Sequence, residues 1–511
     1  MSFPMFFYGV LWLCLLLLPL LFLMMKKKKQ NKHLPPGPPK LPIIGNLHQL
    51  GTLAHRSLWN QSKKYGPVIL LHFGVVPTVV VSSAETARQV LRDHDLESCS
   101  RPLLVGGGKL SYNHLDIAFT PFSNYWREMR KICVLELFST KRVQSFRFIR
   151  EQEVDLLIHS ISKSSLSSSP VDLSEKLLSL LVSITFRTAF GKTFQGNEFD
   201  EGNFQEVFYA AVTVLGDFSA SDFFPYVGWI IDRLTGFHDK LEKSFHYLDG
   251  FYQKVIDQHV NTKYEEDQED IVSQLLKLAE RNQTEHDEVQ FTQDHIKAIL
   301  MNLFLAGVNT SASTLIWAMA HLIKEPRLMK KAQEEIRNCV GKKGKVTEGD
   351  IEQLKYLKLV VKETLRLNPP GPLLLPRETM SHFKINGYDI CPKTRIIVNN
   401  FAIGRDPDFW KFPEEFVPER FEDGIIDFKG QNFELLPFGA GRRGCPGMYM
   451  GLTNVELALA NLLYCFDWKL PNGMKEEDVD MEEESGLSLS KKLPLNLFLS
   501  VISLALVKIK E

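Results

Sequence analysis

The stretch Pro437-Phe438-Gly439-Ala440-Gly441-Arg442-Arg443-Gly444-Cys445-Pro446-Gly447 decides the fold of this 511-residue chain. Its four glycines allow a tight loop that can approach a flat ligand closely. An apolar helical pattern follows over Met448–Tyr464, and Pro446 suits the first position of that helix because a first residue needs no N–H. The helix dipole, the free amides and the two arginines are expected to favour a Cys445 thiolate. A thiolate in that setting is a good ligand for haem iron.

Three other interpretations of this loop compete with an iron ligand. A zinc site needs several cysteines or histidines, whereas the nearest cysteines are Cys391 and Cys465 and no histidine follows His382. The spacing Gly439-x-Gly441-x-x-Gly444 matches a dinucleotide fingerprint, but Pro437 interrupts the strand that should precede it and no βαβ pattern surrounds it. A buried structural cysteine in a glycine-rich turn is the third.

The pattern Phe438-x-x-Gly441-x-Arg443-x-Cys445-x-Gly447 resembles the haem-binding signature of the cytochrome P450 haem-thiolate monooxygenases. The resemblance covers the whole chain, and its proline hinge and Pro-Glu-Arg-Phe motif look like the plant microsomal branch. It implies a P450 fold holding haem b, iron protoporphyrin IX. It also implies that Cys445 is the axial thiolate, that Phe438 packs beside the haem, and that Arg443 pairs with a haem propionate.

Two further elements resemble propionate contacts of that family. Trp126 and Arg130 match a Trp-x-x-x-Arg pattern, and their i, i+4 spacing puts both on one helix face. Taken alone, this pattern fits an amphipathic helix with a surface arginine equally well. Arg377 lies where the family often supplies another propionate contact.

A third motif concerns the scaffold. Glu363 and Arg366 are spaced i, i+3 on one helix face, which in isolation indicates a surface ion pair. With Arg420 of Pro418-Glu419-Arg420-Phe421 they resemble the family's Glu-x-x-Arg triad. A carboxylate buried between two guanidiniums requires dense hydrogen bonding, so the expected role of this triad is structural.

The segment Ala306-Gly307-Val308-Asn309-Thr310-Ser311 lies in the longest helical pattern, Phe291–Ile323, and resembles the family's oxygen-binding helix. Thr310 would help deliver protons to dioxygen, and Gly307 would open room for it. Asn309 stands where the family usually has an acid, and an amide cannot titrate. Two alternatives follow: an oxygenase with a water relay, or a haem-thiolate dehydratase or isomerase, for example one that converts aldoximes to nitriles without dioxygen. Without the cysteine loop, a small-residue packing patch would be the better interpretation.

The remaining patterns predict a mainly α fold with a small β region and one large domain over residues 41–511. Short β patterns occur at Val68–Phe73, Thr78–Val81, Phe383–Ile390 and Thr394–Asn399. Helical periodicity covers most other segments, including Glu85–Asp93, Tyr125–Leu137, Glu151–Ser162, Phe204–Leu215, Leu241–Gln258 and Ile271–Glu280. Polar runs at Ser160–Pro170 and Lys263–Asp270 predict surface loops. Seven scattered cysteines predict no disulfide framework.

The N-terminus predicts a membrane anchor. Residues 3–25 are uncharged and apolar, long enough to span a bilayer as a helix. Residues 26–40 contain a lysine cluster followed by a proline-rich hinge, which predicts a stiff spacer. The positive-inside rule then places the rest of the chain in the cytosol, as a single-pass protein of the endoplasmic reticulum membrane. A cleaved signal peptide would be shorter and would carry its charge before the apolar run.

These features define the expected function. The resemblance implies a monooxygenase that takes dioxygen and a lipophilic substrate, such as a terpenoid, alkaloid, phenolic or amino-acid-derived compound. No convincing flavin or nicotinamide motif occurs, so the electrons should come from NADPH–cytochrome P450 reductase, docking on Arg127, Lys131, Lys141 and Arg142. A solvated charge run explains these four residues equally well. A net charge of −1 argues against a nucleic-acid partner, and a non-catalytic ligand binder is the remaining alternative.

By family position, the substrate pocket should be lined from Arg101–Phe122, Phe204–Trp229, Leu303–Thr310, Pro370–Leu375 and Gly486–Leu489, which are rich in apolar residues.

Overall fold

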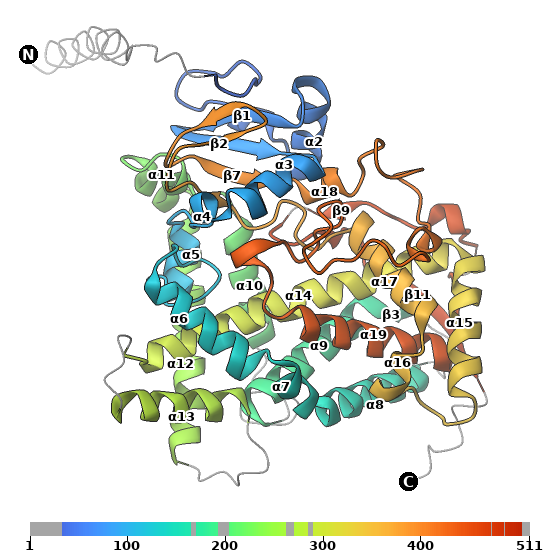
Figure 1. The fold of residues 1–511 in the computed structure, drawn as a ribbon. Helices are drawn as coiled ribbons and strands as arrows, with labels where there is room; N and C mark the ends of the chain where they lie inside the picture. The colour runs from blue at the N-terminus through green and yellow to red at the C-terminus, as the bar shows by residue number, and fades with distance from the viewer. Residues whose placement is uncertain are drawn as a thin grey trace, which may run out of the picture.

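The computed structural model of the chain describes residues 33–164, 170–192, 204–261, 270–284, 290–471, 473–484 and 486–502. Helices make up most of the molecule, and the strands gather mainly at one end, as Figure 1 shows. The predicted mainly α architecture with a small β region is therefore confirmed. The predicted anchor at residues 3–25 and the lysine cluster after it lie outside the described residues.

The helical elements follow one another in chain order, and α14 is the longest. They are η1 (Leu47–Gln49), α2 (Ala54–Tyr65), α3 (Ala84–Arg88), η2 (Gln89–Asp93), α4 (Asp95–Ser98), α5 (Val105–Leu110), α6 (Asn124–Ile132), η3 (Cys133–Leu137), α7 (Thr140–Ser145), α8 (Arg147–Ser164), α9 (Leu173–Phe190), α10 (Phe204–Gly216), η5 (Ala220–Asp222), α11 (Gly228–Leu234), α12 (Phe237–Asn261), α13 (Ile271–Thr284), α14 (Gln293–Lys324), α15 (Pro326–Val340), α16 (Glu348–Ile351), α17 (Lys355–Leu367), α18 (Asn400–Ile403), η7 (Pro418–Phe421), η8 (Gly441–Arg443), α19 (Met448–Cys465) and η9 (Glu476–Asp478).

Helix α14 forms the centre of the core. It packs against α9, α12, α13, α15, α17 and α19 and crosses the middle of the molecule in Figure 1. A helix that is apolar on most of its circumference must be surrounded by protein, and Trp317 of α14 is fully buried. Of the described helices, α14 alone is long and apolar enough to cross a membrane, and most of its apolar stretch is buried within the fold. It is therefore a core helix.

The main sheet has the strand order β1-β2-β7-β4. Strands β1 (Val68–Phe73) and β2 (Val76–Val81) pair antiparallel, β2 pairs parallel with β7 (Arg395–Val398), and β7 pairs antiparallel with β4 (Arg377–Glu378). Strand β1 matches its predicted range, and β2 begins two residues earlier than predicted. Because β7 belongs to this sheet, it connects residues near position 80 with residues near position 395.

The pattern at Phe383–Ile390 predicts one β segment, but the structure contains a hairpin of β5 (Phe383–Ile385) and β6 (Tyr388–Ile390). Asn386 and Gly387 between them both have positive φ, 49° and 80°. An Asn-Gly pair in that conformation is typical of a two-residue hairpin turn, so the turn signal was present in the sequence.

The apolar C-terminal segment, for which the sequence offers no explanation, completes a second sheet. Strand β11 (Asn496–Val501) pairs with β3 (Val171–Asp172) and β8 (Phe466–Lys469). A two-stranded sheet of β9 (Glu483–Glu484) and β10 (Ser490–Lys491) precedes it. Leu497 is fully buried, so its apolar character serves packing.

The structure adds detail to three local expectations. The described part of the proline-rich segment contacts the fold: Leu70 of β1 donates its N–H to the Pro36 carbonyl (2.8 Å), and Asn46 Nδ2 donates to that of Pro39 (3.2 Å). The predicted loop at 160–170 begins later, since α8 continues to Ser164. The predicted helix at 85–93 is present, as α3 followed directly by η2, a segment of wider π-helix.

Candidate haem-thiolate active site

The cysteine loop is closed by its own backbone. The N–H of Cys445 donates to the Phe438 carbonyl (2.9 Å), and the N–H of Gly444 donates to that of Gly441 (3.0 Å). Gly441 has a φ of +71°, and a Cβ there would lie 2.2 Å from the Leu91 carbonyl oxygen. Only glycine satisfies both constraints. The loop is thus held in a fixed shape against the segment that precedes α4.

Helix α19 begins at Met448, with Gly447 as its N-cap. Pro446 therefore lies two residues before the helix, and the prediction that it occupies the first helical position is wrong. Cys445 still faces the helix N-terminus. Desolvation raises the pKa of its thiol, while the backbone N–H of Gly447 and the positive charge of Arg130 lower it. The nearby cation is thus Arg130, rather than the two arginines of the loop.

Asp95 connects the loop to the rest of the molecule, and the sequence offered no signal for it. Its Oδ2 accepts the backbone N–H of Arg442 (3.0 Å) and that residue's Nη1 (3.1 Å). Its Oδ1 accepts Arg377 Nη1 (2.7 Å), and Arg377 Nη2 also donates to the Ala440 carbonyl (3.2 Å). One buried carboxylate therefore positions both Arg377 and the loop.

Five arginines line the cavity; Arg395 lies on β7, and the other four are Arg101, Arg130, Arg377 and Arg443. We consider these four first. Within the described residues, only Arg377 pairs with a carboxylate. Arg130 donates to the Gly444 carbonyl (2.5 Å), and the other two donate only to backbone carbonyls. Arg101 was not predicted as a contact, although it begins a predicted pocket segment.

This cluster carries an excess of positive charge. Burial and, to a smaller extent, the neighbouring charges of Arg377 and Arg130 lower the pKa of Arg443 to about 9. Burial, Arg443 and Arg377 likewise lower the pKa of Arg101 well below its usual value. Buried charges require partners, and guanidiniums pair best with carboxylates. The residues present therefore fit a bound group with two carboxylates, such as haem with its two propionates.

Trp126 takes a different position from the one expected. It is buried and is not among the residues that line the cavity. Its indole Nε1–H donates to the Ile117 carbonyl (3.0 Å), and the Arg443 guanidinium lies 3.8 Å from its ring centroid. An arginine over an indole face is favourable, so Trp126 stabilises the position of the Arg443 guanidinium.

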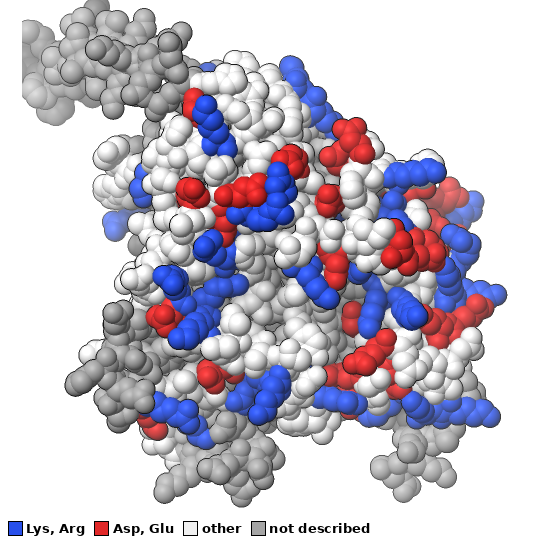
Figure 2. Space-filling view, viewed as in Figure 1, with Lys and Arg blue, Asp and Glu red and all other residues white. Residues whose placement is uncertain are grey.

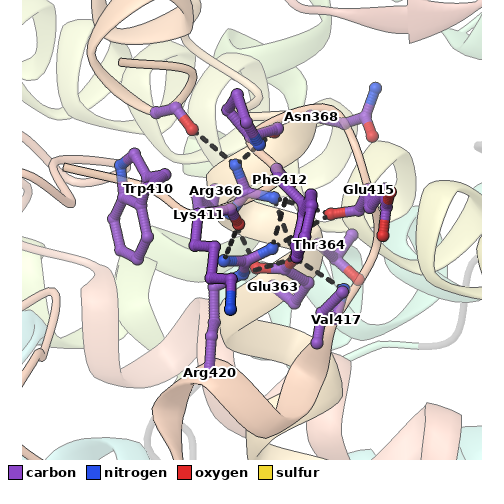
Figure 3. Close-up of polar contacts among 12 residues, drawn as sticks. Glu363, Thr364, Arg366, Asn368, Trp410, Lys411, Phe412, Glu415, Val417 and Arg420 are labelled. Atoms are coloured by element: carbon purple, nitrogen blue, oxygen red, sulfur yellow. Dashed lines mark hydrogen bonds and ion pairs between the residues drawn. The ribbon is translucent and has the colours of Figure 1, made fainter. Parts of the chain in front are cut away.

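The predicted triad is present: Glu363 and Arg366 are fully buried, and the Arg420 side chain is largely buried. Glu363 accepts Arg366 Nε (2.7 Å) and Nη2 (2.8 Å), and also Arg420 Nε (2.9 Å). Figure 3 shows the carboxylate between the two guanidiniums, with the Val417 N–H donating to it as well (2.8 Å). The triad therefore joins α17 to residues 404–420, which precede the cysteine loop.

Helix α14 also contributes to the wall of the cavity. Ala306, Gly307, Asn309 and Thr310 all line it. The Thr310 hydroxyl donates to the Ala306 carbonyl (2.5 Å), so its oxygen keeps lone pairs for other donors. A Cβ at Gly307 would meet nothing closer than 4.0 Å, so glycine is not required there for packing.

The cavity has a volume of about 1180 Å³, and most of its lining is apolar. All five predicted pocket segments contribute residues to it. So do three segments that were not predicted: the region before and in α2, part of α9, and β7 with Arg395 and Ile397. Apart from Trp126, every predicted site residue lines this cavity: Asn309, Thr310, Arg130, Arg377, Phe438, Arg443 and Cys445.

Comparisons with known proteins agree with this geometry. The model of the family "Cytochrome P450" matches residues 35–497. The chain is 58% identical to Cytochrome P450 71B37 of Arabidopsis thaliana over 463 residues, covering 91% of this chain and 92% of that protein. It is 57% identical to Cytochrome P450 71B36 of the same plant over 463 residues, with the same coverage. A structure of a zebra fish cytochrome P450 with progesterone superimposes with a TM-score of 0.76 at 25% identity, covering 87% of this chain and 99% of that chain. The chain therefore belongs to the cytochrome P450 family of haem-thiolate monooxygenases.

Proposed function

We propose that this protein is a membrane-anchored monooxygenase that oxidises a lipophilic specialised metabolite with dioxygen and electrons from NADPH–cytochrome P450 reductase. Terpenoids, alkaloids, phenolics and amino-acid-derived compounds all have the required character. The observation that carries the proposal is that Cys445 and Thr310 line the same, largely apolar cavity. Such a cavity selects substrates by lipophilicity and shape.

In this proposal the Cys445 thiolate would hold the haem iron, and the bound haem would supply the activation of dioxygen. Arg130, Arg377 and Arg443 would hold the propionates. A guanidinium has five N–H donors, and each of these arginines uses at most three in the contacts described above. Phe438 packs beside the ring and also meets Phe428 edge to face, with centroids 5.5 Å apart.

Thr310 and Asn309 of α14 would take part in proton delivery to the cavity. The Thr310 oxygen can accept a hydrogen bond while its own proton goes to Ala306. Asn309 offers an amide that orients water but releases no proton. Proton delivery would therefore run through Thr310 and ordered water, without an ionisable side chain at position 309.

The experiment that tests this function compares turnover with and without dioxygen. A substrate found by its shift of the haem Soret band should be oxidised only when dioxygen, NADPH and reductase are all present. The alternative, a dehydratase or isomerase, is favoured by Asn309 alone, and it would turn over its substrate without dioxygen and reductase. A protein with a thiolate-type carbon-monoxide spectrum and no turnover of any ligand would support a non-catalytic binder.

Replacing Asn309 with aspartate is expected to increase the coupling between NADPH use and product. The new carboxyl can release a proton into the cavity, which the amide cannot, and positioned proton transfer usually contributes strongly to rate. The measurement is the ratio of product formed to NADPH consumed. Asn309→Ala, which removes the amide, should lower the same ratio. A ratio unchanged in both variants would argue against any role of this position in proton delivery.

The predicted reductase surface is partly supported by exposure. Arg127, Lys131 and Lys141 are exposed on α6 and α7, and Figure 2 shows basic side chains over this part of the molecule. Arg142 is less available, because its Nε donates to the Glu136 carbonyl and its Nη2 bonds to Gln274. The proposed docking surface therefore consists of the first three residues.

Reversing the three exposed charges to glutamate should raise the reductase concentration needed for half-maximal turnover by about tenfold, because rim charges steer association. The effect should shrink as salt is added. The matched control reverses Lys254, Lys330 and Lys384, three exposed lysines on α12, α15 and β5. Equal titration curves for the two triple variants would remove docking from this surface.

We further propose that residues 3–25 anchor the chain in the endoplasmic reticulum membrane. Residues 26–40 would form the basic cluster and hinge that follow the anchor, and the catalytic domain, residues 41–511, would lie in the cytosol. An exposed apolar surface supports contact with lipid: Tyr226, Leu234 and Ile43 are all largely exposed. The segments around Ile43 and Tyr226 are both hydrogen-bonded to the turn after β1. The N–H of Val75 donates to the Phe223 carbonyl, and the N–H of Gly74 donates to that of Ile44. Large exposed apolar patches mark protein or membrane contacts.

A further inference from the structure

Beside the main cavity lies a second pocket of about 380 Å³. Its charged lining consists of Arg101, Asp222, Glu378, Lys393 and Arg395. Two of these residues, Arg101 and Arg395, also line the main cavity. Their guanidiniums therefore lie in the wall between an apolar space and a polar one. We call this second pocket the polar annex.

Arg395 is the residue of the annex with unused bonding capacity. It is 8% exposed, and its Nε has no hydrogen-bond partner among the described residues. Its Nη2 donates to the Asp222 carbonyl (3.3 Å), and its guanidinium lies 5.1 Å from the centroid of the Phe223 ring. Within the described part of the chain, no carboxylate lies within ion-pairing distance of it. A buried donor without a partner costs free energy unless a ligand satisfies it.

The strand that carries Arg395 places it in the wall of the main cavity. Successive side chains of a strand point to opposite faces, so Arg395 and Ile397 of β7 share one face. Both line the main cavity. The apolar wall of that cavity therefore ends, along β7, at a guanidinium.

The charges of the annex favour an anion. Three cations, Arg101, Lys393 and Arg395, face two carboxylates. Glu378 is engaged by Lys393 Nζ (2.8 Å). Asp222 accepts the Val105 N–H (2.9 Å), and burial raises its pKa to about 6. The pocket thus keeps a net positive charge even when both acids are ionised.

We propose that the polar annex binds a carboxylate at one end of an otherwise apolar substrate, with Arg395 as its partner. The hydrocarbon part would then lie in the main cavity over the haem. A guanidinium matches a carboxylate geometrically, with two parallel N–H···O bonds. The inference rests on the proposed function and narrows its substrate class to amphiphilic carboxylic acids.

The test uses full-length holoprotein and pairs of ligands that differ only in the head group. The probes are saturated and phenyl-substituted carboxylic acids of increasing chain length and their methyl esters, titrated by the Soret shift. For the pair that fits, the acid should bind about tenfold more tightly than its ester, since a charge-assisted hydrogen bond contributes roughly 1.5 kcal/mol. Arg395→Gln should abolish that preference and leave the affinity for the ester unchanged.

The matched control is Lys393→Gln, which removes the same charge from the same pocket but from a residue already paired with Glu378. It should keep most of the preference for the acid. Equal affinity of acid and ester, equal loss in both variants, or no Soret shift with any acid would overturn the carboxylate subsite. A wild-type protein without a thiolate-type carbon-monoxide spectrum would instead overturn the proposed function.

Discussion

Cys445→Ser is expected to abolish the thiolate-type Soret band of the reduced carbon-monoxide complex and, with it, all oxygen-dependent turnover. A serine hydroxyl is far less acidic than a thiol and donates little electron density, whereas the thiolate is what favours O–O cleavage in haem-thiolate enzymes. The loop itself should survive the substitution, because its shape depends on the backbone bond from Cys445 to Phe438 and on the glycines.

The control is Cys339→Ser. Cys339 is half-buried on α15, and its sulfur contacts Gln353 at 3.6 Å. It does not line the cavity, so the variant should keep the wild-type spectrum and turnover. If Cys445→Ser retained the thiolate-type band, the iron ligand would have to be another residue and the assignment of the site would be wrong.

The parts of this structure that the sequence predicted are those in which the signal is local. The glycine pattern around Cys445, the short apolar run that forms β1 and the long apolar run of α14 each lie within one continuous stretch. Each of these signals depends only on neighbouring residues. The glycines of the loop allow positive φ, the apolar residues of β1 favour a strand, and α14 lacks a polar face. The ranges of these elements accordingly differ from prediction by only a few residues.

The parts that were missed depend on contacts between distant segments. Asp95 looks like an ordinary acidic residue until folding brings it against Arg377 and Arg442, 282 and 347 positions away. Helix spacing indicates that Trp126 and Arg130 share a face, but not that the Trp126 indole packs against Arg443; the contact of Trp126 with a propionate stays a prediction. The same applies to Arg395, whose burial and unused Nε depend on where η5 lies against β7.

The second large effect is expected at Glu363. Replacing it with alanine should lower the free energy of unfolding by about 3–5 kcal/mol, since removing one partner of a buried ion pair leaves uncompensated buried charge. Here two guanidiniums would lose their carboxylate at once. Arg366 keeps its bonds to the carbonyls of Gly404 and Pro413, and Arg420 keeps those to Lys411 and Phe412, but carbonyl oxygens do not neutralise charge.

Two comparisons separate charge from packing. Glu363→Gln keeps the side-chain shape and one acceptor oxygen, so it should lose less stability than alanine while still leaving the charges unpaired. Glu85→Gln removes an exposed i, i+3 partner of Arg88, and should cost less than about 1 kcal/mol because exposed pairs contribute little. The measurement is the denaturation midpoint of the holoprotein, with haem retention followed in parallel.

Haem retention should fall with stability in the Glu363 variants, because the triad holds residues 404–420 and those residues lead into the cysteine loop. If instead Glu363→Ala unfolded at the wild-type midpoint, the two arginines would have to be satisfied by their carbonyl contacts alone. If it lost stability but kept all its haem, the loop would be positioned mainly by Asp95, Arg377 and the backbone bond of Cys445. Stability and haem retention measured together therefore decide whether the cysteine loop is positioned by Asp95 alone or by Asp95 and Glu363 together.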